Sequence, residues 1–327
     1  MKAVLTHGFG GPEVMYIGNA TKPSPRNKEV LVKIKATALN RADTMQRKGN
    51  YPPPPGASPI LGLEFSGEIV TLGAEVTNYA IGDRVCGLLS GGGYAEFLAI
   101  HEDMAIGIPD TMSYTQAAAI PEVFLTAFQA LRYLAMLCPS ESVLIHAGAS
   151  GVGTAAIQLA RAIGAKDIIV TASASKHQIC KNLGANSTID YKSDDFEKVI
   201  ESITDKKGID VIIDFMGASY FQQNINCLAM DGRMVMLAFL GGIKAEVNLA
   251  NILRKRLKIM GSTLRARSID YKIALTRDFK EFALPLFQNG DLKPVIDSVY
   301  NWKDVIAAHE FMESNKNKGK IILEVSD

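Results

Sequence analysis

The sequence predicts an α/β protein in which a doubly wound parallel sheet is inserted into a β-rich domain. Its 327 residues are enough for about two domains, each with a core of its own. Up to about Pro109, short strand-like segments are punctuated by Gly and Pro. From Val143 onward, strand-like and helix-like segments alternate, which indicates βαβ crossovers and a parallel sheet.

The first half is predicted to be the β-rich domain. Glu29–Ala38 alternates apolar with charged side chains, which is the period of a half-buried strand. Similar segments follow at Leu63–Leu72, Arg84–Leu88 and Tyr94–Ile100. A helical stretch that is broken by Pro121 then resumes toward Leu137.

The second half is predicted to hold six parallel strands with helices between them. The expected strands are Val143–His146, Ile168–Ala172, Ser187–Asp190, Val211–Asp214, Arg233–Leu237 and Leu257–Ser262. The expected helices are Thr154–Ile163, Lys176–Leu183 and Phe196–Thr204. Because Leu257–Ser262 is expected at one edge of the sheet, pairing with a second copy would bury that edge.

The C-terminal tail is too short for a core of its own. It offers helices at Tyr271–Gln288 and Asp304–Glu313 and strands near Val295–Val299 and Lys320–Val325. We therefore expect it to complete the N-terminal domain. The predicted domains are residues 1–121 with 262–327, and the inserted residues 122–261, with a ligand cleft between them.

Composition excludes several classes of function. Lys+Arg 35 against Asp+Glu 34 gives a net charge of +1, so no nucleic-acid partner is expected. The local cluster Arg254–Lys258 is interpreted as a solvated helix end. No run of about 18 apolar residues and no signal-peptide core occurs, so we expect a cytoplasmic protein that does not enter membranes.

The four cysteines are predicted to be free. They are far apart, share no metal-ligand spacing and each sit in an apolar stretch, where a free Cys packs as a small hydrophobe. They are Cys86, Cys138, Cys180 and Cys227.

A glycine-rich turn after the strand at Val143 predicts a dinucleotide site. Its residues are His146, Ala147, Gly148, Ala149, Ser150, Gly151, Val152 and Gly153, and a helix follows. Glycines let the main chain approach a pyrophosphate, and the N–H groups at the helix start bind its charge. Ser150 stands where the middle glycine is usual, so its side chain must point away from the phosphates or hydrogen-bond to them. The alternative is a strand-turn-helix corner without a ligand.

The next strand favours NADPH over NADH. An NAD site would place an acid at the end of this strand to bind the ribose 2′-hydroxyl. Residues 171–176 contain no acid, and Ser173 and Lys176 suit a 2′-phosphate. Ser173 or Ser175 could also serve as an ordinary helix N-cap.

The segment Ser140–Gly153, with Gln158 and Arg161 after it, resembles the quinone oxidoreductase signature of the medium-chain dehydrogenase/reductase superfamily. The β-rich half matches that family at Ala38–Asp43, Pro59–Gly67, Gly82–Val85 and Gly91–Phe97. The segments Asn40–Gly49, Tyr51–Ser58 and Glu313–Lys320 resemble its stress-inducible, tumour-suppressor-inducible NADPH:quinone oxidoreductase branch. The resemblance covers essentially the whole chain.

This resemblance implies a GroES-like catalytic domain, an inserted Rossmann domain that binds NADPH, and a homodimer. It implies that Asn40 and Thr126 lie near the nicotinamide, and that Tyr191 joins Ser173 and Lys176 near the 2′-phosphate. Main-chain contacts are implied at Gly217, Phe239, Leu240 and Gly241.

Tyr51 is implied to face the substrate. Together with Asn40 and Thr126 it forms the expected catalytic set. Each has an ordinary structural alternative. Asn40 could cap the helix that starts near Ala42, Thr126 could be a packed helix residue, and Tyr51 could pack on the prolines that follow it.

No zinc is expected. Where zinc-dependent relatives carry Cys and His ligands, this chain has Asn40, Arg41 and Leu63, and only Glu64 remains. The five histidines are scattered, and His146 is predicted to be a hydrogen-bonded core residue. Alcohol oxidation is therefore not expected.

The leading hypothesis is an NADPH-dependent, metal-free reductase of quinones, because these acceptors need neither a metal nor a strong acid. An NADPH-dependent reductase of enals or enones uses the same fold and cofactor. A third hypothesis is a non-catalytic NADPH-binding protein similar to zeta-crystallin. The sequence does not choose the acceptor, since the shape of the cleft selects it.

Overall fold

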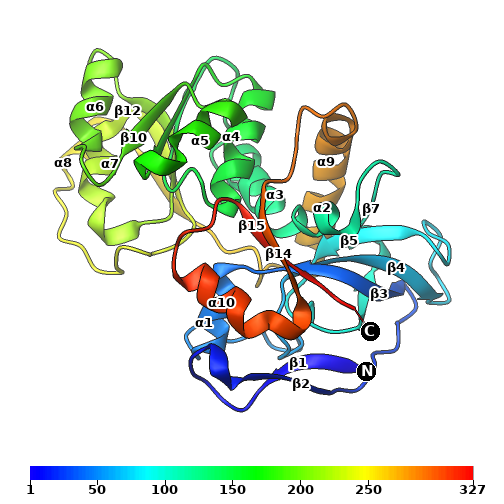
Figure 1. The fold of residues 1–327 in the computed structure, drawn as a ribbon. Coiled ribbons are helices and arrows are strands. Elements are labelled where there is room, and N and C mark those ends of the chain that lie inside the picture. Colours follow the sequence, from blue (N-terminus) through cyan, green and yellow to red (C-terminus); the bar gives the residue numbers. More distant parts are fainter. Residues whose placement is uncertain (327) are drawn as a thin grey trace. The chain divides into compact units, whose positions relative to one another are not determined.

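A computed structural model of the chain describes residues 1–326 (Figure 1). The chain divides into two compact units. The first comprises Met1–Leu125 and Leu264–Asp327, and the second comprises Thr126–Thr263. The chain thus leaves the first unit a few residues after the predicted position 121 and returns shortly after position 262.

The first unit is built on a seven-stranded sheet with the order β14-β15-β3-β4-β5-β7, and β6 also pairs with β3. A second, two-stranded sheet, β1-β2, is joined to the segment before β6 by a bridge between Ala3 and Ala95. The strands are β1 Lys2–Thr6, β2 Met15–Asn19, β3 Glu29–Ala38, β4 Glu64–Leu72, β5 Arg84–Leu88, β6 Phe97–His101, β7 Ala105–Gly107, β14 Ile296–Asn301 and β15 Lys320–Glu324. The helices are α1 Arg41–Arg47, α2 Tyr114–Ala118, α9 Ile269–Gln288 and α10 Val305–Glu313.

The C-terminal tail belongs to this N-terminal sheet. Strand β15 runs antiparallel to β3 and pairs Ile322 with Ala38. The alternation in β3 buries Val30, Val32 and Ile34 in the core of this unit. A segment from the end of the chain therefore completes the sheet that the start of the chain begins.

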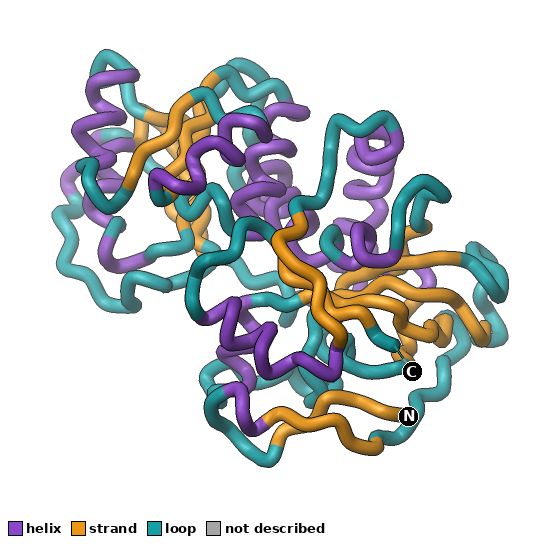
Figure 2. Tube along the Cα trace, viewed as in Figure 1, coloured by secondary structure: helices purple, strands orange, loops and turns teal. Residues whose placement is uncertain are grey.

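The second unit is a six-stranded parallel sheet with the order β10-β9-β8-β11-β12-β13. Helices cover both faces of this sheet (Figure 2). The strands are β8 Ser142–Ile145, β9 Asp167–Ala172, β10 Ser187–Asp190, β11 Ile209–Asp214, β12 Leu228–Met236 and β13 Lys258–Gly261. The helices are α4 Gly151–Ile163, α5 His177–Leu183, α6 Phe196–Ile203, α7 Phe221–Cys227 and α8 Ala250–Arg254, and the boundary between the two units falls within α3 Pro121–Phe128.

Burial on both faces explains why these strands have nearly continuous apolar sequences. Leu144, Ile169 and Ile212 are at most 2% exposed. Helix α7 was not predicted, because it contains few apolar residues. The helix expected to resume after Pro121 is present, but from Gln129 to Leu134 it is a π-helix, which the sequence did not indicate. Among the helices of residues 1–326, none combines the length and the apolar character needed to cross a membrane.

Two expectations, that all four cysteines are packed in apolar surroundings and that Arg254–Lys258 is solvated, are wrong in part. Cys86, Cys180 and Cys227 are buried, but Cys138 is exposed, because the apolar helix ends before it and its N–H binds the side chain of Glu141. The cluster Arg254–Lys258 is not a fully solvated helix end. Its Lys255 is partly buried because the ammonium donates to two main-chain carbonyls at 2.7 Å each.

A chain of buried polar groups links α1 to α10 in the first unit. The guanidinium of Arg47 donates to Nδ1 of His309 at 2.9 Å, which leaves the proton on Nε2. That nitrogen lies 3.3 Å from the hydroxyl of Tyr94, which lies 3.3 Å from Asp43 Oδ2. Burial, and then the charge of Arg47, lowers the pKa of His309 to about 3, so this imidazole stays neutral.

We predict that replacing His309 with Gln reduces the acid sensitivity of the fold. A histidine with a folded pKa below its unfolded value of 6.5 contributes stability that is complete above that value. This contribution is lost as the pH falls toward the folded pKa of about 3. The free energy of unfolding is measured by denaturant titration at several pH values between these two. Its slope against pH should be smaller in His309→Gln by up to ~1.4 kcal/mol per pH unit. The matched change at the exposed His7 is the control, and identical slopes for His309→Gln and the parent would refute the assignment.

Candidate active site

A glycine-rich turn connects β8 to α4 in the parallel sheet. Ala147 has a φ of 48°, and Ser150 is the N-cap residue of α4. The Oγ of Ser150 accepts a hydrogen bond from the N–H of Gly153 at 3.1 Å. This side chain therefore serves the helix start, and its O–H remains able to donate to a ligand.

Close packing requires two glycines of this turn. A Cβ at Gly148 would lie 2.7 Å from the Cβ of Val170 on β9. A Cβ at Gly153 would collide with the carbonyl oxygen of Ala147. The helix start approaches the turn this closely only because both positions lack a side chain.

The N–H groups of Gly151 and Val152 have no hydrogen-bond partner within residues 1–326. Both belong to the first turn of α4, where unpaired N–H groups and the helix dipole attract an anion. The hydroxyl of Thr126 on α3 is likewise buried without a partner in the described chain, as are Asn224 Nδ2 and Ser298 Oγ. A buried unpaired polar atom costs about 1–3 kcal/mol unless a ligand or water meets it. The turn and Thr126 therefore fit a dinucleotide.

The ends of β9 and β10 bring Ser173 and Tyr191 side by side. The parallel register pairs Ala172 with Asp190, and these two residues directly precede Ser173 and Tyr191. Ser173 heads the short turn Ala174–Lys176, but its side chain makes no capping hydrogen bond. The hydroxyl of Ser173 is thus not used as the helix cap that was the alternative interpretation.

The loops after β11 and β12 bind each other through main-chain hydrogen bonds. The N–H of Gly217 donates to Asp214 Oδ2 at 2.9 Å. The N–H groups of Leu240 and Gly241 donate to carbonyls of the opposite loop at 3.0 and 2.7 Å. Phe239 and Leu240 are both more than half exposed. A ligand can therefore contact this edge through carbonyl oxygens and side chains, but not through these three N–H groups.

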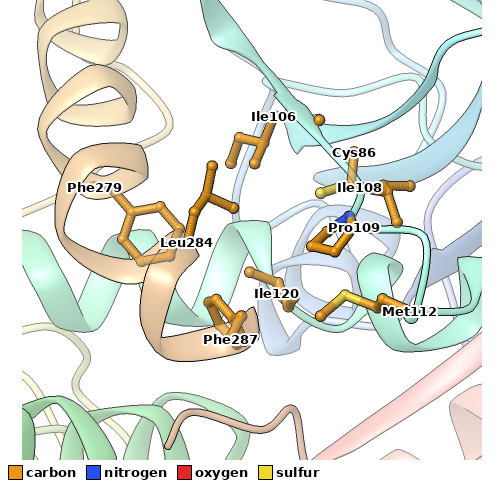
Figure 3. A pocket seen from close by; sticks show the side chains of 10 residues that line it. Cys86, Ile106, Ile108, Pro109, Met112, Ile120, Phe279, Leu284 and Phe287 are labelled. Carbon is orange, nitrogen blue, oxygen red and sulfur yellow. The ribbon is translucent and has the colours of Figure 1, made fainter. Parts of the chain in front are cut away.

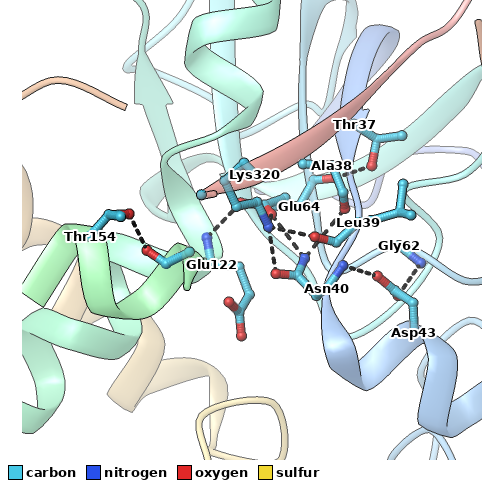
Figure 4. Close-up of polar contacts among 12 residues, drawn as sticks. Thr37, Ala38, Leu39, Asn40, Asp43, Gly62, Glu64, Glu122, Thr154 and Lys320 are labelled. Atoms are coloured by element: carbon cyan, nitrogen blue, oxygen red, sulfur yellow. Dashed lines mark hydrogen bonds and ion pairs between the residues drawn. The ribbon is translucent and has the colours of Figure 1, made fainter. Parts of the chain in front are cut away.

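Asn40 lies in a buried polar cluster of the first unit (Figure 4). Its Nδ2 donates to Glu64 Oε1 at 2.9 Å, and its Oδ1 accepts from Lys320 Nζ at 2.6 Å. Lys320 also forms an ion pair with Glu64 at 2.7 Å, and the N–H of Glu122 donates to Glu64 Oε2 at 2.8 Å. Asn40 is the N-cap residue of α1, where its main-chain N–H donates to Asp43 Oδ2 at 2.8 Å, but its side chain makes no capping hydrogen bond.

The groups around Glu64 do not fit zinc. Its two oxygens already bind an ammonium ion, an amide and a main-chain N–H. Zinc requires three or four N, S or O ligands held together. Across the described chain, no group of three or more His, Cys, Asp or Glu side chains could hold a metal ion.

Tyr51 lies beneath the guanidinium of Arg265, whose carbon is 5.1 Å from the centre of the phenol ring. Arg265 is held in turn by the carbonyl of Ser90 at 2.9 Å and by Gln46 Oε1 at 2.6 Å. Burial raises the pKa of Tyr51, and the charge of Arg265 opposes this only in part. The phenol therefore stays protonated at neutral pH, and its ring contacts a cation.

His146 is fully buried at the end of β8, as the sequence predicted for a core residue. Its Nδ1 bonds to Thr171 Oγ1 at 3.0 Å and its Nε2 to Asn224 Oδ1 at 2.7 Å. Burial lowers the pKa of this imidazole, so it is held neutral and serves the fold.

One small cavity lies between the β5–β7 edge and α9 (Figure 3). Its volume of about 10 Å³ has room for no more than one water molecule. Nine of its lining side chains are labelled in Figure 3, all apolar or sulfur-containing, and Cys86 is among them. Burial raises the pKa of Cys86, so its thiol is no nucleophile. This cavity is a packing defect rather than a ligand site.

Sequence reasoning missed Lys320 and Arg265. Lys320 opens the apolar strand β15, where a lone cation is a signal of a buried partner. Arg265 is only 5% exposed and follows β13 in a loop with no recognisable pattern. Both partners lie far away in the sequence, so neither pairing had a local signal.

Comparison with known proteins matches both parts of the chain. The family model described as "Alcohol dehydrogenase GroES-like domain" matches residues 26–110, and the one described as "Zinc-binding dehydrogenase" matches residues 151–288. Quinone oxidoreductase of Mus musculus is 32% identical over 331 residues, which is 99% of this chain and 97% of the relative.

Two solved structures are also similar over nearly all of both chains. A mycobacterial protein in complex with NADPH is 26% identical, with a TM-score of 0.87, and the match covers 99% of this chain and 100% of that one. CurK enoyl reductase is 27% identical, with a TM-score of 0.88, and the match covers 99% of each chain.

Proposed function

The chain belongs to the quinone oxidoreductase group of the medium-chain dehydrogenase/reductase superfamily, and on this premise we propose that it is an NADPH-dependent, metal-free reductase of quinones. The observation that carries the proposal is the cluster of Asn40, Glu64 and Lys320. Its carboxylate is neutralised by an internal ammonium ion. A quinone is already a good hydride acceptor, so its reduction needs no metal to polarise it.

The proposed cofactor site lies at the carboxyl edge of the parallel sheet. Gly151 and Val152 supply free N–H groups for the pyrophosphate, and Ser173 and Lys176, with Tyr191 beside them, bind the 2′-phosphate. NADPH supplies the hydride when it is bound. The similarity to a mycobacterial protein solved with NADPH supports this choice.

The proposed role of Tyr51 is to position the acceptor. Its phenol is protonated and its ring is held against Arg265. Asn40 and Thr126 are proposed to face the nicotinamide, and the unpaired hydroxyl of Thr126 supports this. The segments Tyr51–Ser58 and Glu313–Lys320 further support a place in the stress-inducible branch of the family.

A second candidate is the reduction of enals or enones, which the similarity to CurK enoyl reductase favours. An enolate formed from such an acceptor needs a proton, whereas a reduced quinone takes protons from water. Turnover of NADPH with a panel of quinones and enones separates the two, and binding without turnover would favour a non-catalytic protein.

The cofactor prediction is a preference for NADPH over NADH. A charge-assisted hydrogen bond contributes ~1.5–3 kcal/mol, so Lys176→Glu should weaken NADPH binding roughly ten- to hundredfold and NADH binding far less. Titration of intrinsic fluorescence with each cofactor measures this. Lys181→Glu, a charge reversal at an exposed position of α5, is the control. Equal catalytic efficiency of the parent protein with both cofactors would contradict the proposed 2′-phosphate site.

The metal prediction is that quinone turnover survives exhaustive chelation. The oxygens of Glu64 are already paired with Lys320, Asn40 and a main-chain N–H, so no ligand set holds zinc. Elemental analysis of the purified protein measures the metal content directly. One tightly held zinc ion per chain, lost together with activity, would overturn this part of the proposal.

The acceptor prediction concerns Tyr51→Phe and Asn40→Ala. If Tyr51 only positions the acceptor, Tyr51→Phe keeps substantial turnover with quinones, because a true proton donor contributes about 10²–10⁴-fold. Asn40→Ala should lower both turnover and cofactor affinity. Steady-state rates on a quinone and an enone measure both effects. A thousandfold fall for Tyr51→Phe with quinones, at unchanged cofactor affinity, would make Tyr51 a proton donor.

We also propose that two copies pair through the edge strand β13 to form a homodimer. Strand β13 is the last of the parallel sheet, and a Cβ at Gly261 would meet no atom within 4 Å of its own chain. Gly261→Lys should therefore fold but separate the copies, because it places two like charges at the shared edge. Sedimentation at micromolar concentration should show twice the 35.3 kDa chain mass for the parent and for the control Gly107→Lys. A monomeric parent would refute the dimer.

A further inference from the structure

The amide of Asn40 has no hydrogen to spare. Its Nδ2 donates to Glu64 Oε1 at 2.9 Å and to the carbonyl of Ala38 at 3.3 Å, which uses both of its protons. Its Oδ1 accepts from Lys320 Nζ at 2.6 Å. One lone pair on Oδ1 is the only hydrogen-bonding capacity that remains.

All three protons of the Lys320 ammonium are likewise used in hydrogen bonds within the protein. Its ammonium contacts Asn40 Oδ1, Glu64 Oε1 at 2.7 Å and the carbonyl of Leu39 at 2.7 Å, which accounts for its three protons. The side chains of Lys320 and Glu64 are 4% and 0% exposed. This cation has no proton left for a ligand, so any influence on a ligand passes through its neighbours.

The ion pair also decides which way the amide of Asn40 points. A half-turn about its terminal bond would place the NH₂ group against the ammonium of Lys320 and the oxygen against the carboxylate of Glu64. Both contacts would then be repulsive, inside a region of low dielectric. Only one orientation of the amide is compatible with the two charges.

We propose that Lys320, together with Glu64, is a positioning residue that fixes Asn40 as a pure hydrogen-bond acceptor toward the bound dinucleotide. The inference rests on the proposed function for the identity of that ligand. Asn40 then meets an O–H or N–H donor, which is a ribose hydroxyl or the nicotinamide carboxamide. It cannot donate to the carbonyl oxygen of a quinone.

The test is a double-mutant cycle on NADPH affinity, measured by fluorescence titration without any acceptor. Lys320→Met/Glu64→Met removes both charges at nearly constant volume, so no buried charge is left unpaired. In the parent background these two substitutions together should weaken NADPH binding about three- to tenfold, because the amide of Asn40 loses its fixed orientation. In the Asn40→Ala background it should have no further effect.

Two results would overturn the proposal. Equal losses in both backgrounds would mean that the ion pair only supports the fold, and unchanged affinity in the parent background would mean that it does not act on the ligand. If the Lys320→Met/Glu64→Met variant does not fold, Lys320→Met/Glu64→Gln enters the same cycle, because it also leaves no buried charge unpaired. Any orientation of this Gln amide turns its NH₂ group toward another donor, so Asn40 loses its fixed orientation with little change in volume.

The donor group is identified with the 3-acetylpyridine analogue of NADPH, which lacks the amide N–H but keeps the ribose hydroxyls. If the coupling between Asn40 and the ion pair persists with the analogue, the donor is a ribose hydroxyl. If the coupling vanishes, the donor is the carboxamide. Failure of the parent protein to bind NADPH at all would instead contradict the proposed function. Quinone turnover of the parent protein is measured separately, so that a failure of the proposed function is distinguished from a failure of the positioning role of Lys320.

Discussion

The ion pair between Lys320 and Glu64 is the constraint on which the first unit depends. It joins the start of β15 to the start of β4, and Lys320 also binds the carbonyl of Leu39. The carboxylate accepts in addition from the N–H of Glu122, at the start of α3. Removal of one partner from a buried pair costs about 3–5 kcal/mol, because the other charge is then left uncompensated. Three elements from distant parts of the chain are thus fixed around one carboxylate.

The same unit holds its other buried ionisable groups uncharged or paired. Burial keeps the His309 imidazole and the Cys86 thiol neutral. Asp43, whose pKa is raised by burial to about 6, is held by the N–H groups of Asn40 and Gly62. Asp43, Cys86 and His309 are each at most 2% exposed. This agrees with a protein whose residues bind and orient while the cofactor supplies the chemistry.

The second unit depends on close approach between a turn and a helix. Gly148 and Gly153 leave no room for a side chain, and this brings the free N–H groups of Gly151 and Val152 to the carboxyl edge of the sheet. The parallel register then sets Ser173 beside Tyr191 at the same edge. A ligand that carries two phosphate groups far apart can be bound by one edge of one sheet.

The sequence by itself determined the elements whose signal is local. Alternation predicted β3, apolar runs predicted the parallel strands, and the glycine turn predicted the start of α4, because period and turn chemistry act within a few residues. It also singled out Asn40 and Tyr51 as positions of interest, through resemblance to a family. The sequence did not determine which polar atoms of these residues remain available to a ligand.

Tertiary structure alone decided the partners. Lys320 meets Asn40 across 280 positions of sequence, and Arg265 meets Gln46 across 219, distances over which no periodicity carries information. The exposure of Cys138 and the partial burial of Lys255 were missed for the same reason, since burial depends on what folds back over a residue. Composition and local pattern select the kind of element. A single buried charge is too costly without a partner. Which charges become partners is decided only by the tertiary structure, which brings their strands together.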